Sequence, residues 1–192
     1  MGCHGGFSLD EETRRSWYNP EAILRDIGLA AGMVFMDVGC GDGFFSLLAA
    51  RVVGGNGIVY AVDSDAKAIE RLKASAEEQD LPNIKVKVGS AEETAFCTTC
   101  ADVIFYSMVL HDFRDPAQVL RNAKKMIKPS GKLVDLDWKK QHMPFGPPFE
   151  IRFSEADAAG LLKMSGFMVT SVKDAGPNHY VIVAQSDAHC VP

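Results

Sequence analysis

The residues best suited to bind a ligand form a cluster of acids and glycines in the first third of the chain. Asp37 is followed by Gly39, Gly41 and Gly43, and a second acid, Asp63, comes after the next apolar segment. Alternate glycines let the backbone adopt positive φ and approach a ligand closely, and the helix expected next presents unpaired N–H groups at its start. This stretch predicts a small-molecule site between a strand and a helix.

The glycine spacing and the first acid narrow the kind of ligand. A dinucleotide site is expected to read GxGxxG with an acid about 20 residues further on, whereas the third glycine here comes one residue earlier. Asp37 also precedes the first glycine, and a negative charge at this position would repel the pyrophosphate of a dinucleotide. A ligand that carries an ammonium and a sulfonium group fits this pattern better.

Apolar segments that alternate with amphipathic ones must position this cluster. Strands are expected at 33–37, 57–63, 84–88, 101–107 and 132–138, with helices between most of them, and two last strands at 168–173 and 180–184. One of these helices is expected to run from Asp115 through Lys128. The alternation predicts an α/β fold, a doubly wound (Rossmann-like), mostly parallel seven-stranded sheet with a C-terminal antiparallel hairpin.

We expect one domain over residues 1–192, because a chain of this length buries enough surface for a single core. Residues 1–32 are predicted to form an N-terminal helical cap, broken at Asn19-Pro20. Residues 139–153 lack a periodic pattern but combine prolines with bulky apolar side chains. Such a long irregular connection predicts a substrate lid.

Composition limits the partners. A net charge of -5 argues against nucleic-acid binding, which usually needs a clustered basic face. No run of about 18 apolar residues is present to insert into a membrane. The N-terminus lacks the regions of a signal peptide, so we expect a cytoplasmic location. Separately, we expect the protein to be a monomer or a homodimer.

Five cysteines, an odd number, favour reduced thiols. Cys97 and Cys100 form a lone CxxC, for which loop thiols are expected and a redox pair is the alternative. The pairs Cys3-His4 and His189-Cys190 could close a metal site only if the two ends of the chain met. We expect no metal.

Four motifs occur in register along the chain: DVGCGDGFF, AVDSD, ADVIFYSMVLHDF and IKPSGKLVDLDW. Together they resemble the class I S-adenosylmethionine-dependent methyltransferases over essentially the whole chain. The sequence is similar to a small subgroup that includes the ubiquinone/menaquinone-biosynthesis and arsenite methyltransferases. The resemblance implies S-adenosylmethionine as the cofactor and leaves the methyl acceptor open.

Carried over by position, the resemblance implies a role for each part of the cofactor site. Asp37 would hold the amino group of the methionine part, and the Asp63 carboxylate can accept hydrogen bonds from both ribose hydroxyls. The remaining candidates that the resemblance implies are Gly39, Cys40 and Gly41 for the methionine, Ser64, Ser90, Ala91 and Glu92 for the adenine, and Ser107 and Met108 for the sulfonium region. Tyr18, at the break of the N-terminal cap, is a further candidate that faces the cofactor, with an anchor that packs the cap onto the domain as the alternative.

His111 is the candidate catalytic residue, because it follows the fourth strand at the sheet end where ligands bind and titrates near neutral pH. The alternative is a loop histidine hydrogen-bonded to Asp112 or to the backbone. Asp137 and Trp138 end the fifth strand on the same side and could form another wall of the pocket. The apolar lid suggests a small, hydrophobic or aromatic acceptor.

The sequence favours methyl transfer to a small-molecule acceptor by in-line displacement, in which alignment and exclusion of water supply much of the rate. A general base is optional. A non-catalytic S-adenosylmethionine-binding or regulatory protein is one alternative. A nicotinamide-dependent oxidoreductase is another, disfavoured by the glycine spacing and by Asp37.

Overall fold

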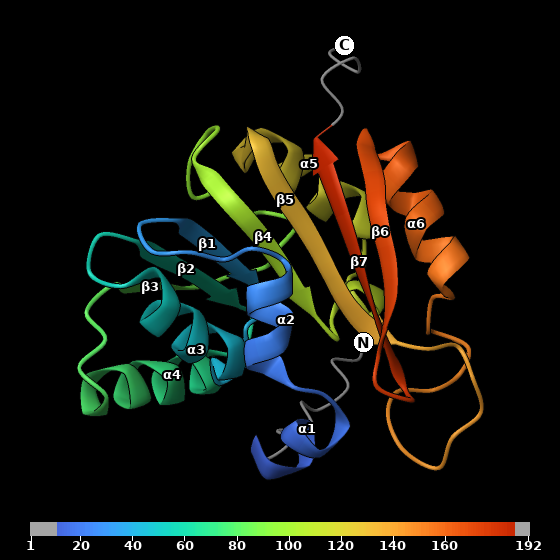
Figure 1. Ribbon diagram of the computed structural model, residues 1–192, viewed down its shortest axis with the longest axis horizontal. Helices are drawn as coiled ribbons and strands as arrows, with labels where there is room; N and C mark the ends of the chain where they lie inside the picture. Colours follow the sequence, from blue (N-terminus) through green and yellow to red (C-terminus); the bar gives the residue numbers. More distant parts are fainter. Residues whose placement is uncertain (1–10, 187–192) are drawn as a thin grey trace.

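The computed structural model describes residues 11–186 of the chain (Figure 1). The first ten residues of the predicted helical cap and both terminal Cys-His pairs lie outside this range. Seven strands form one sheet in the order β3-β2-β1-β4-β5-β7-β6. The strands are β1 (Val34–Val38), β2 (Ile58–Asp63), β3 (Ile84–Val88), β4 (Ala101–Ser107), β5 (Ile127–Trp138), β6 (Phe167–Ala175) and β7 (His179–Ser186).

Strands β1 to β5 are parallel, and β7 runs antiparallel to both β5 and β6. This arrangement confirms the predicted fold class, including the C-terminal hairpin. It also places the half-exposed β3 at an edge of the sheet, as its alternation of apolar residues and lysines indicates.

Helices cover both faces of the sheet. Three clusters of buried side chains result: α2 and α3 pack over residues such as Phe35 and Phe105, α4 packs over Ala61, and α5 and α6 pack over residues such as Ile104 and Leu133 on the other face. The helices are α1 (Glu11–Trp17), α2 (Pro20–Asp26), α3 (Phe44–Val53), α4 (Ala66–Glu78), α5 (Pro116–Met126) and α6 (Glu155–Met164), with a short 3-10 turn, η1 (Leu110–Asp112).

Local signals set several helix ends. The Asn19 side chain accepts a hydrogen bond from the Ala22 amide at the start of α2, which explains the break before Pro20. Ser154 and Asp157 form the predicted capping box of α6. The prediction that α5 reaches Lys128 is wrong by two residues, because Ile127 already pairs with the first residue of β4.

The carboxyl ends of the five parallel strands all lie at the lower edge of the sheet in Figure 1, beside α1 and the irregular 139–153 loop. Ligands of open α/β sheets bind beyond this edge. No helix among residues 11–186 is long and apolar enough to cross a bilayer.

Candidate functional site

The glycine loop follows β1 and has the backbone conformation that its sequence requires. Gly39, Gly41 and Gly43 all have positive φ, at 76°, 54° and 89°. A Cβ atom on Gly39 would lie 2.5 Å from Cγ2 of Val109, whereas one on Gly41 would meet nothing within 4 Å. Gly39 is therefore needed for packing, and Gly41 borders open space where a ligand can approach.

The amide groups of this loop are already used inside the protein. The N–H groups of Gly39 and Cys40 both donate to the Val62 carbonyl, at 2.8 and 3.1 Å. The Gly41 N–H donates to Oδ2 of Asp63 at 2.8 Å. A phosphate needs free N–H donors, so these three positions suit a cationic ligand that donates hydrogen bonds to backbone carbonyl oxygens.

Asp63 is held from two sides. Its Oδ1 atom accepts a hydrogen bond from the Asp65 amide at 2.9 Å, and its Oδ2 atom accepts the one from Gly41. Each carboxylate oxygen has two lone pairs, so one acceptor position on each oxygen is left for a further donor. This fits the predicted contact with two neighbouring hydroxyl groups.

Asp37 is an acid buried at the end of β1, with its side chain on the face covered by α3. The residue is 1% exposed, and its Oδ2 atom accepts a 2.6 Å hydrogen bond from the Ser46 hydroxyl. Its Oδ1 atom is buried and has no hydrogen-bond partner among residues 11–186. Burial raises the pKa of Asp37 to about 6, against the opposing effects of Ser46 and of the Arg14 charge. The Oδ1 atom of Asp37 is therefore a buried acceptor that a donor group of a ligand could satisfy.

Of the predicted adenine residues, Ser90, Ala91 and Glu92 lie in the loop after β3, and Ser64 directly follows β2. The Gly89 amide donates to the carbonyl of Asp63, which brings Ser64 and Ser90 into neighbouring loops. The Ser90 hydroxyl donates to Oε2 of Glu92 at 2.6 Å. Oε1 of Glu92 in turn accepts from the amides of residues 114 and 115 before α5, so Glu92 ties this loop to the helix.

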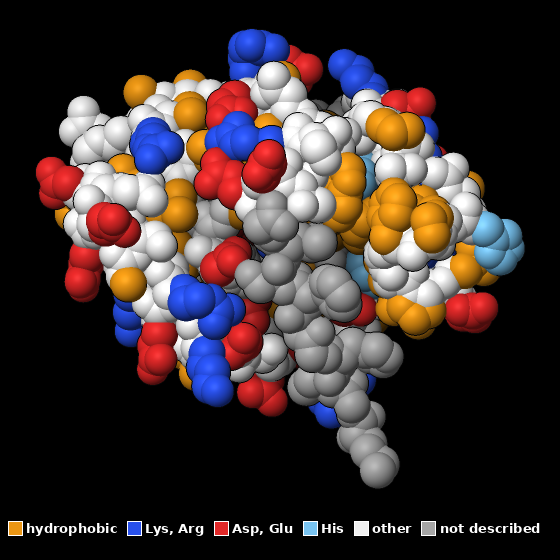
Figure 2. Space-filling model, turned by 90° about the horizontal axis from the view of Figure 1, so that it is seen from below, with side chains coloured by type: hydrophobic (Ala, Val, Ile, Leu, Met, Phe, Trp, Pro, Cys, Tyr) orange, Lys and Arg blue, Asp and Glu red, His pale blue; other side chains and the backbone are white. Residues whose placement is uncertain are grey.

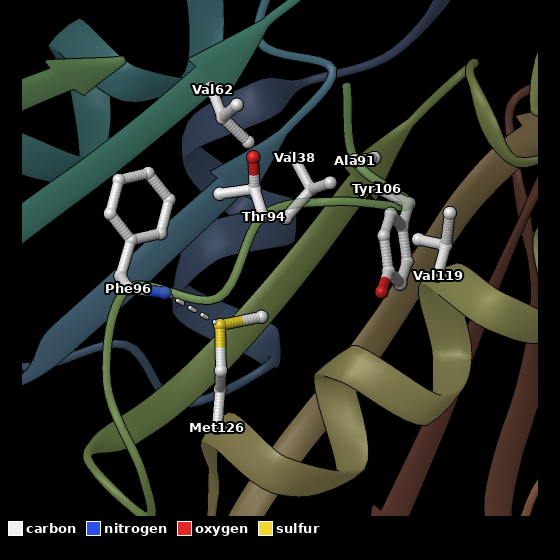
Figure 3. A pocket seen from close by; sticks show the side chains of 8 residues that line it. All are labelled: Val38, Val62, Ala91, Thr94, Phe96, Tyr106, Val119 and Met126. Atoms are coloured by element: carbon white, nitrogen blue, oxygen red, sulfur yellow. Dashed lines mark hydrogen bonds between the residues drawn. The ribbon is translucent and has the colours of Figure 1, made fainter. Parts of the chain in front are cut away.

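Under this loop lies an apolar floor. Figure 3 shows side chains from β1, β2, β4, the 89–100 loop and α5 converging there, and the hydroxyl of Thr94 donates to the Ser90 carbonyl at 2.7 Å. Ala91 belongs to this lining, and Asn122 donates to its carbonyl at 3.2 Å. The floor packs against the loop that carries residues 90–92. Its lining residues are Val38, Val62, Ala91, Thr94, Phe96, Tyr106, Val119 and Met126.

At the end of β4, Met108 adopts a left-handed backbone with φ of 55°, and its N–H donates to the Leu136 carbonyl at 2.6 Å. Such a conformation is uncommon for a residue with a side chain. The hydroxyl of the preceding Ser107 is buried and makes no hydrogen bond within residues 11–186. Val109 then fills the space above Gly39.

Tyr18 reaches the same region from the N-terminal segment. Its ring stacks on Phe45 at 6.2 Å and contacts His179 edge-on at 5.3 Å. Burial raises the pKa of Tyr18 to about 12, which the nearby Arg14 and Ser107 partly oppose. The structure therefore brings Tyr18 to the end of β4, although 18 and 107 are far apart in the sequence.

His111 lies in η1 and pairs with the acid that ends β5. Its Nδ1 atom is 2.8 and 2.9 Å from the two carboxylate oxygens of Asp137, and both side chains are almost fully buried. Burial alone lowers the pKa of His111, but the hydrogen bond and charge of Asp137 outweigh it, so the net pKa is raised. Asp112 lies further away, 3.6 Å from Nε2. Sequence reasoning placed His111 and Asp137 at the same edge but missed their pairing.

A second buried acid, Asp135, was also missed. Asp135 and Asp137 point to the same face of β5 because side chains alternate along a strand. Asp135 is fully buried between the hydroxyl-bearing rings of Tyr106 and Tyr180, and neither of its oxygens has a hydrogen-bond partner in the described part of the chain. Burial and the charge of Asp137 hold its pKa well above the usual range, against a smaller opposing effect of Tyr180.

The 139–153 loop is organised around one buried cation. The Arg152 side chain donates to the carbonyls of Pro147, Phe145 and Gln141 at 2.8, 3.0 and 3.0 Å, and its guanidinium lies over the Trp138 ring. A hollow of about 330 Å³ lies inside the loop. Figure 2 shows hydrophobic side chains gathered over this loop, at the right of the view onto the ligand edge.

The loop is closed against the N-terminal segment. The Trp17 ring stacks on Phe145 at 5.8 Å and meets Trp138 edge-on at 5.0 Å. Two segments far apart in the sequence thus cover the same end of the sheet. The predicted lid function is not tested by this contact, but the contact gives the loop a defined closed position.

None of the three cysteines within residues 11–186 has the character of a reactive thiolate. Cys97 and Cys100 form a disulfide at the start of β4, at the opposite edge of the sheet, so the expectation of loop thiols is not what the structure shows. Burial, together with Asp37 and Asp63, raises the pKa of Cys40 and disfavours a thiolate. Within residues 11–186 no group of three metal-binding side chains occurs.

Comparison with known proteins identifies the family. A family model described as a methyltransferase domain matches residues 29–157. A solved S-adenosylmethionine-dependent methyltransferase of Aquifex aeolicus is 30% identical with a TM-score of 0.87, over 92% of this chain and 94% of that one. The demethylmenaquinone methyltransferases of Staphylococcus aureus and Listeria welshimeri are 26% and 28% identical over 64% and 59% of this chain. The chain spans about half the length of these two relatives, 50% and 48%.

The fold and the comparisons define a class I S-adenosylmethionine-dependent methyltransferase. The chain belongs to the methyltransferase domain family. These findings confirm the resemblance, the enzyme class and S-adenosylmethionine as the cofactor. The individual site residues and the methyl acceptor stay predictions.

Proposed function

We propose that this protein transfers a methyl group from S-adenosylmethionine to a small-molecule acceptor at the carboxyl edge of its sheet. One observation carries the cofactor site: the buried Oδ1 atom of Asp37, which has no donor among residues 11–186, stands beside a glycine loop whose amides are used internally. An ammonium group is the donor that this pair of features fits.

Each predicted residue has a place in this proposal. Asp37 and the carbonyl groups of Gly39, Cys40 and Gly41 hold the amino-acid part of the cofactor, and the free acceptor positions of Asp63 hold the ribose hydroxyls. The rest of the proposed cofactor site consists of Ser64, Ser90, Ala91 and Glu92 around the adenine, and Ser107, Met108 and Tyr18 near the sulfonium.

When bound, S-adenosylmethionine supplies a methyl group on a positively charged sulfur. The chain contributes alignment and a dry site, which are the main requirements of an in-line displacement. Trp17 and Phe145 close the apolar 139–153 lid over the sheet edge and exclude water. Both rings support an acceptor with an apolar or aromatic body.

His111 is the proposed proton acceptor. Asp137 binds its Nδ1 atom and so leaves Nε2 as the position that can take a proton from an acceptor hydroxyl or thiol. The active form of the imidazole is the neutral one, and its fraction increases as pH rises. Because Asp137 raises the pKa of His111, this increase takes place at a higher pH than for an ordinary histidine.

The experiment that tests this function has a binding step and a product step. Calorimetry with S-adenosylhomocysteine and with a nicotinamide dinucleotide separates the two cofactor classes. Mass spectrometry then looks for methylated products from a panel of thiols, phenols, quinol precursors and arsenite. An aromatic quinol comes first, because two relatives are named demethylmenaquinone methyltransferases.

A second candidate is a non-catalytic S-adenosylmethionine-binding protein, favoured by one observation: the His111 side chain is only 2% exposed. Binding without any methylated product would support it. The predicted absence of nucleic-acid partners, the cytoplasmic location and the monomeric or dimeric state stay predictions, and light scattering of the purified protein tests the last.

A further inference from the structure

Arg14 is an arginine of α1 held beside the glycine loop without strong partners. Its side chain is 14% exposed, and its guanidinium lies 5.1 Å above the Phe44 ring at the start of α3. Its Nε atom is buried and has no hydrogen-bond partner among residues 11–186. The Nη2 atom is 3.8 Å from Oδ1 of Asp42, which is too long for a hydrogen bond. A buried guanidinium donor of this kind needs an explanation.

The next residue shows what a purely structural arginine looks like here. Arg15 also lies over the Phe44 ring, at 5.8 Å, but it donates to Glu11 at 2.7 Å and to both oxygens of Glu21 at 2.8 and 2.9 Å. These contacts secure α1 at the surface. Arg14 makes no comparable set of contacts within residues 11–186, so its Nε donor has no hydrogen-bond partner in this part of the chain.

The position of Arg14 relates it to the acid that ends β1. Its charge acts on both Asp37 and Tyr18, lowering the pKa that burial gives each of them. The amino-acid part of the cofactor carries an ammonium and a carboxylate on the same carbon. If Asp37 holds the ammonium, the carboxylate must lie within a few ångströms of it and needs a donor of its own.

We propose that Arg14 binds the α-carboxylate of the cofactor, so that Arg14 and Asp37 together recognise the zwitterionic amino-acid end. This assignment rests on the proposed cofactor site. A guanidinium matches a carboxylate with two parallel N–H···O bonds, and such charge-assisted bonds are stronger than neutral ones. The Nε atom, which has no partner among residues 11–186, and the adjacent Nη2 atom, 3.8 Å from Asp42, provide the required fork. Binding then ties α1, and Tyr18 behind it, to the glycine loop.

A pair of ligands that differ only in the carboxylate tests the assignment. We would measure by calorimetry the dissociation constants of S-adenosylhomocysteine and of its decarboxylated analogue, 5′-deoxy-5′-(3-aminopropylthio)adenosine. The wild-type protein should prefer the first by about tenfold to hundredfold, the range of a charge-assisted hydrogen bond. In Arg14→Gln the preference should disappear, through weaker binding of S-adenosylhomocysteine alone. Arg15→Gln, the matched control, should keep the wild-type ratio.

The outcomes separate cleanly. Equal loss of affinity for both ligands in Arg14→Gln, or an unchanged ratio, overturns the assignment and leaves Arg14 as a packing residue. A wild-type protein that binds neither ligand overturns the proposed function itself, and the assignment with it. Arg14→Lys keeps the charge but loses the fork, so an intermediate ratio is expected in a variant with little effect on folding.

Discussion

Asp37 should have opposite effects on stability and on cofactor binding. Burial raises its pKa to about 6 from a usual value near 3.8, so the folded protein holds this proton more tightly than the unfolded chain. The stability contributed by protonated Asp37 is present in full below pH 3.8 and is lost as pH rises through about 6. At pH 7 the shift of roughly two units corresponds to a destabilisation of about 3 kcal/mol.

Replacing the acid with its amide removes that penalty and also removes the charge. Asp37→Asn should therefore raise the unfolding free energy of the ligand-free protein at pH 7 by up to about 3 kcal/mol. The same change should weaken S-adenosylhomocysteine binding by about 2 kcal/mol, as the loss of a hydrogen bond between charged groups does. Urea unfolding and calorimetry on the same samples measure the two effects.

The pH dependence of binding gives the sharpest readout. An ammonium ligand needs ionised Asp37, so wild-type affinity should fall about tenfold per pH unit below pH 6, and Asp37→Asn should show no such slope. Ser46→Ala removes the hydroxyl that favours the ionised form and should move the midpoint to higher pH. A wild-type affinity that is constant from pH 5 to 7 would refute the reasoning.

Three further changes test the surrounding structure. Asp137→Asn should lower the pKa of His111, since the hydrogen bond and the charge that raise it most are removed; NMR titration of the imidazole measures this, and the acid-side midpoint of turnover should shift down with it. Asp135→Asn should stabilise the protein increasingly as pH rises from 5 to 8, because a raised carboxyl pKa favours folding only at low pH; thermal unfolding that shows no gain at pH 8 contradicts it. Gly39→Ala should destabilise by about 1–3 kcal/mol through its φ of 76° and the contact with Val109, and Val109→Ala in the same chain should restore part of the loss in urea unfolding.

The sequence was informative wherever a signal was local. The alternation of apolar and amphipathic segments located the strands, and the acids Asp37 and Asp63 were recognisable as lying at or near strand ends, because each directly follows an apolar run; they are the next-to-last residue of β1 and the last residue of β2. The capping box at Ser154 is equally local. The fold followed from such signals, whereas the cofactor followed from the family resemblance of four motifs in register.

Contacts that depend on the order of the strands in the sheet could not be predicted from the sequence. Asp137 pairs with His111 only because β4 and β5 are neighbours with parallel ends, and Asp135 meets Tyr180 only because β7 inserts between β5 and β6. Arg152 looks like any surface arginine in the sequence, yet carbonyl groups of its own loop surround it. Its role depends on a fold of the 139–153 loop that no periodic pattern encodes.

The two hydrogen bonds that the Asp63 carboxylate accepts also affect the cost of ligand binding. Since the amides of Gly41 and Asp65 fix the carboxylate at 2.8 and 2.9 Å, this side chain loses its rotational freedom when the protein folds and not when a ligand arrives. Ordering a side chain on binding costs about 0.5–1.5 kcal/mol, and Asp63 avoids this cost. These hydrogen bonds join the loops after β1 and β2, so under the proposed ribose contact a nucleoside alone, without the amino-acid end, should bind without the cost of ordering Asp63.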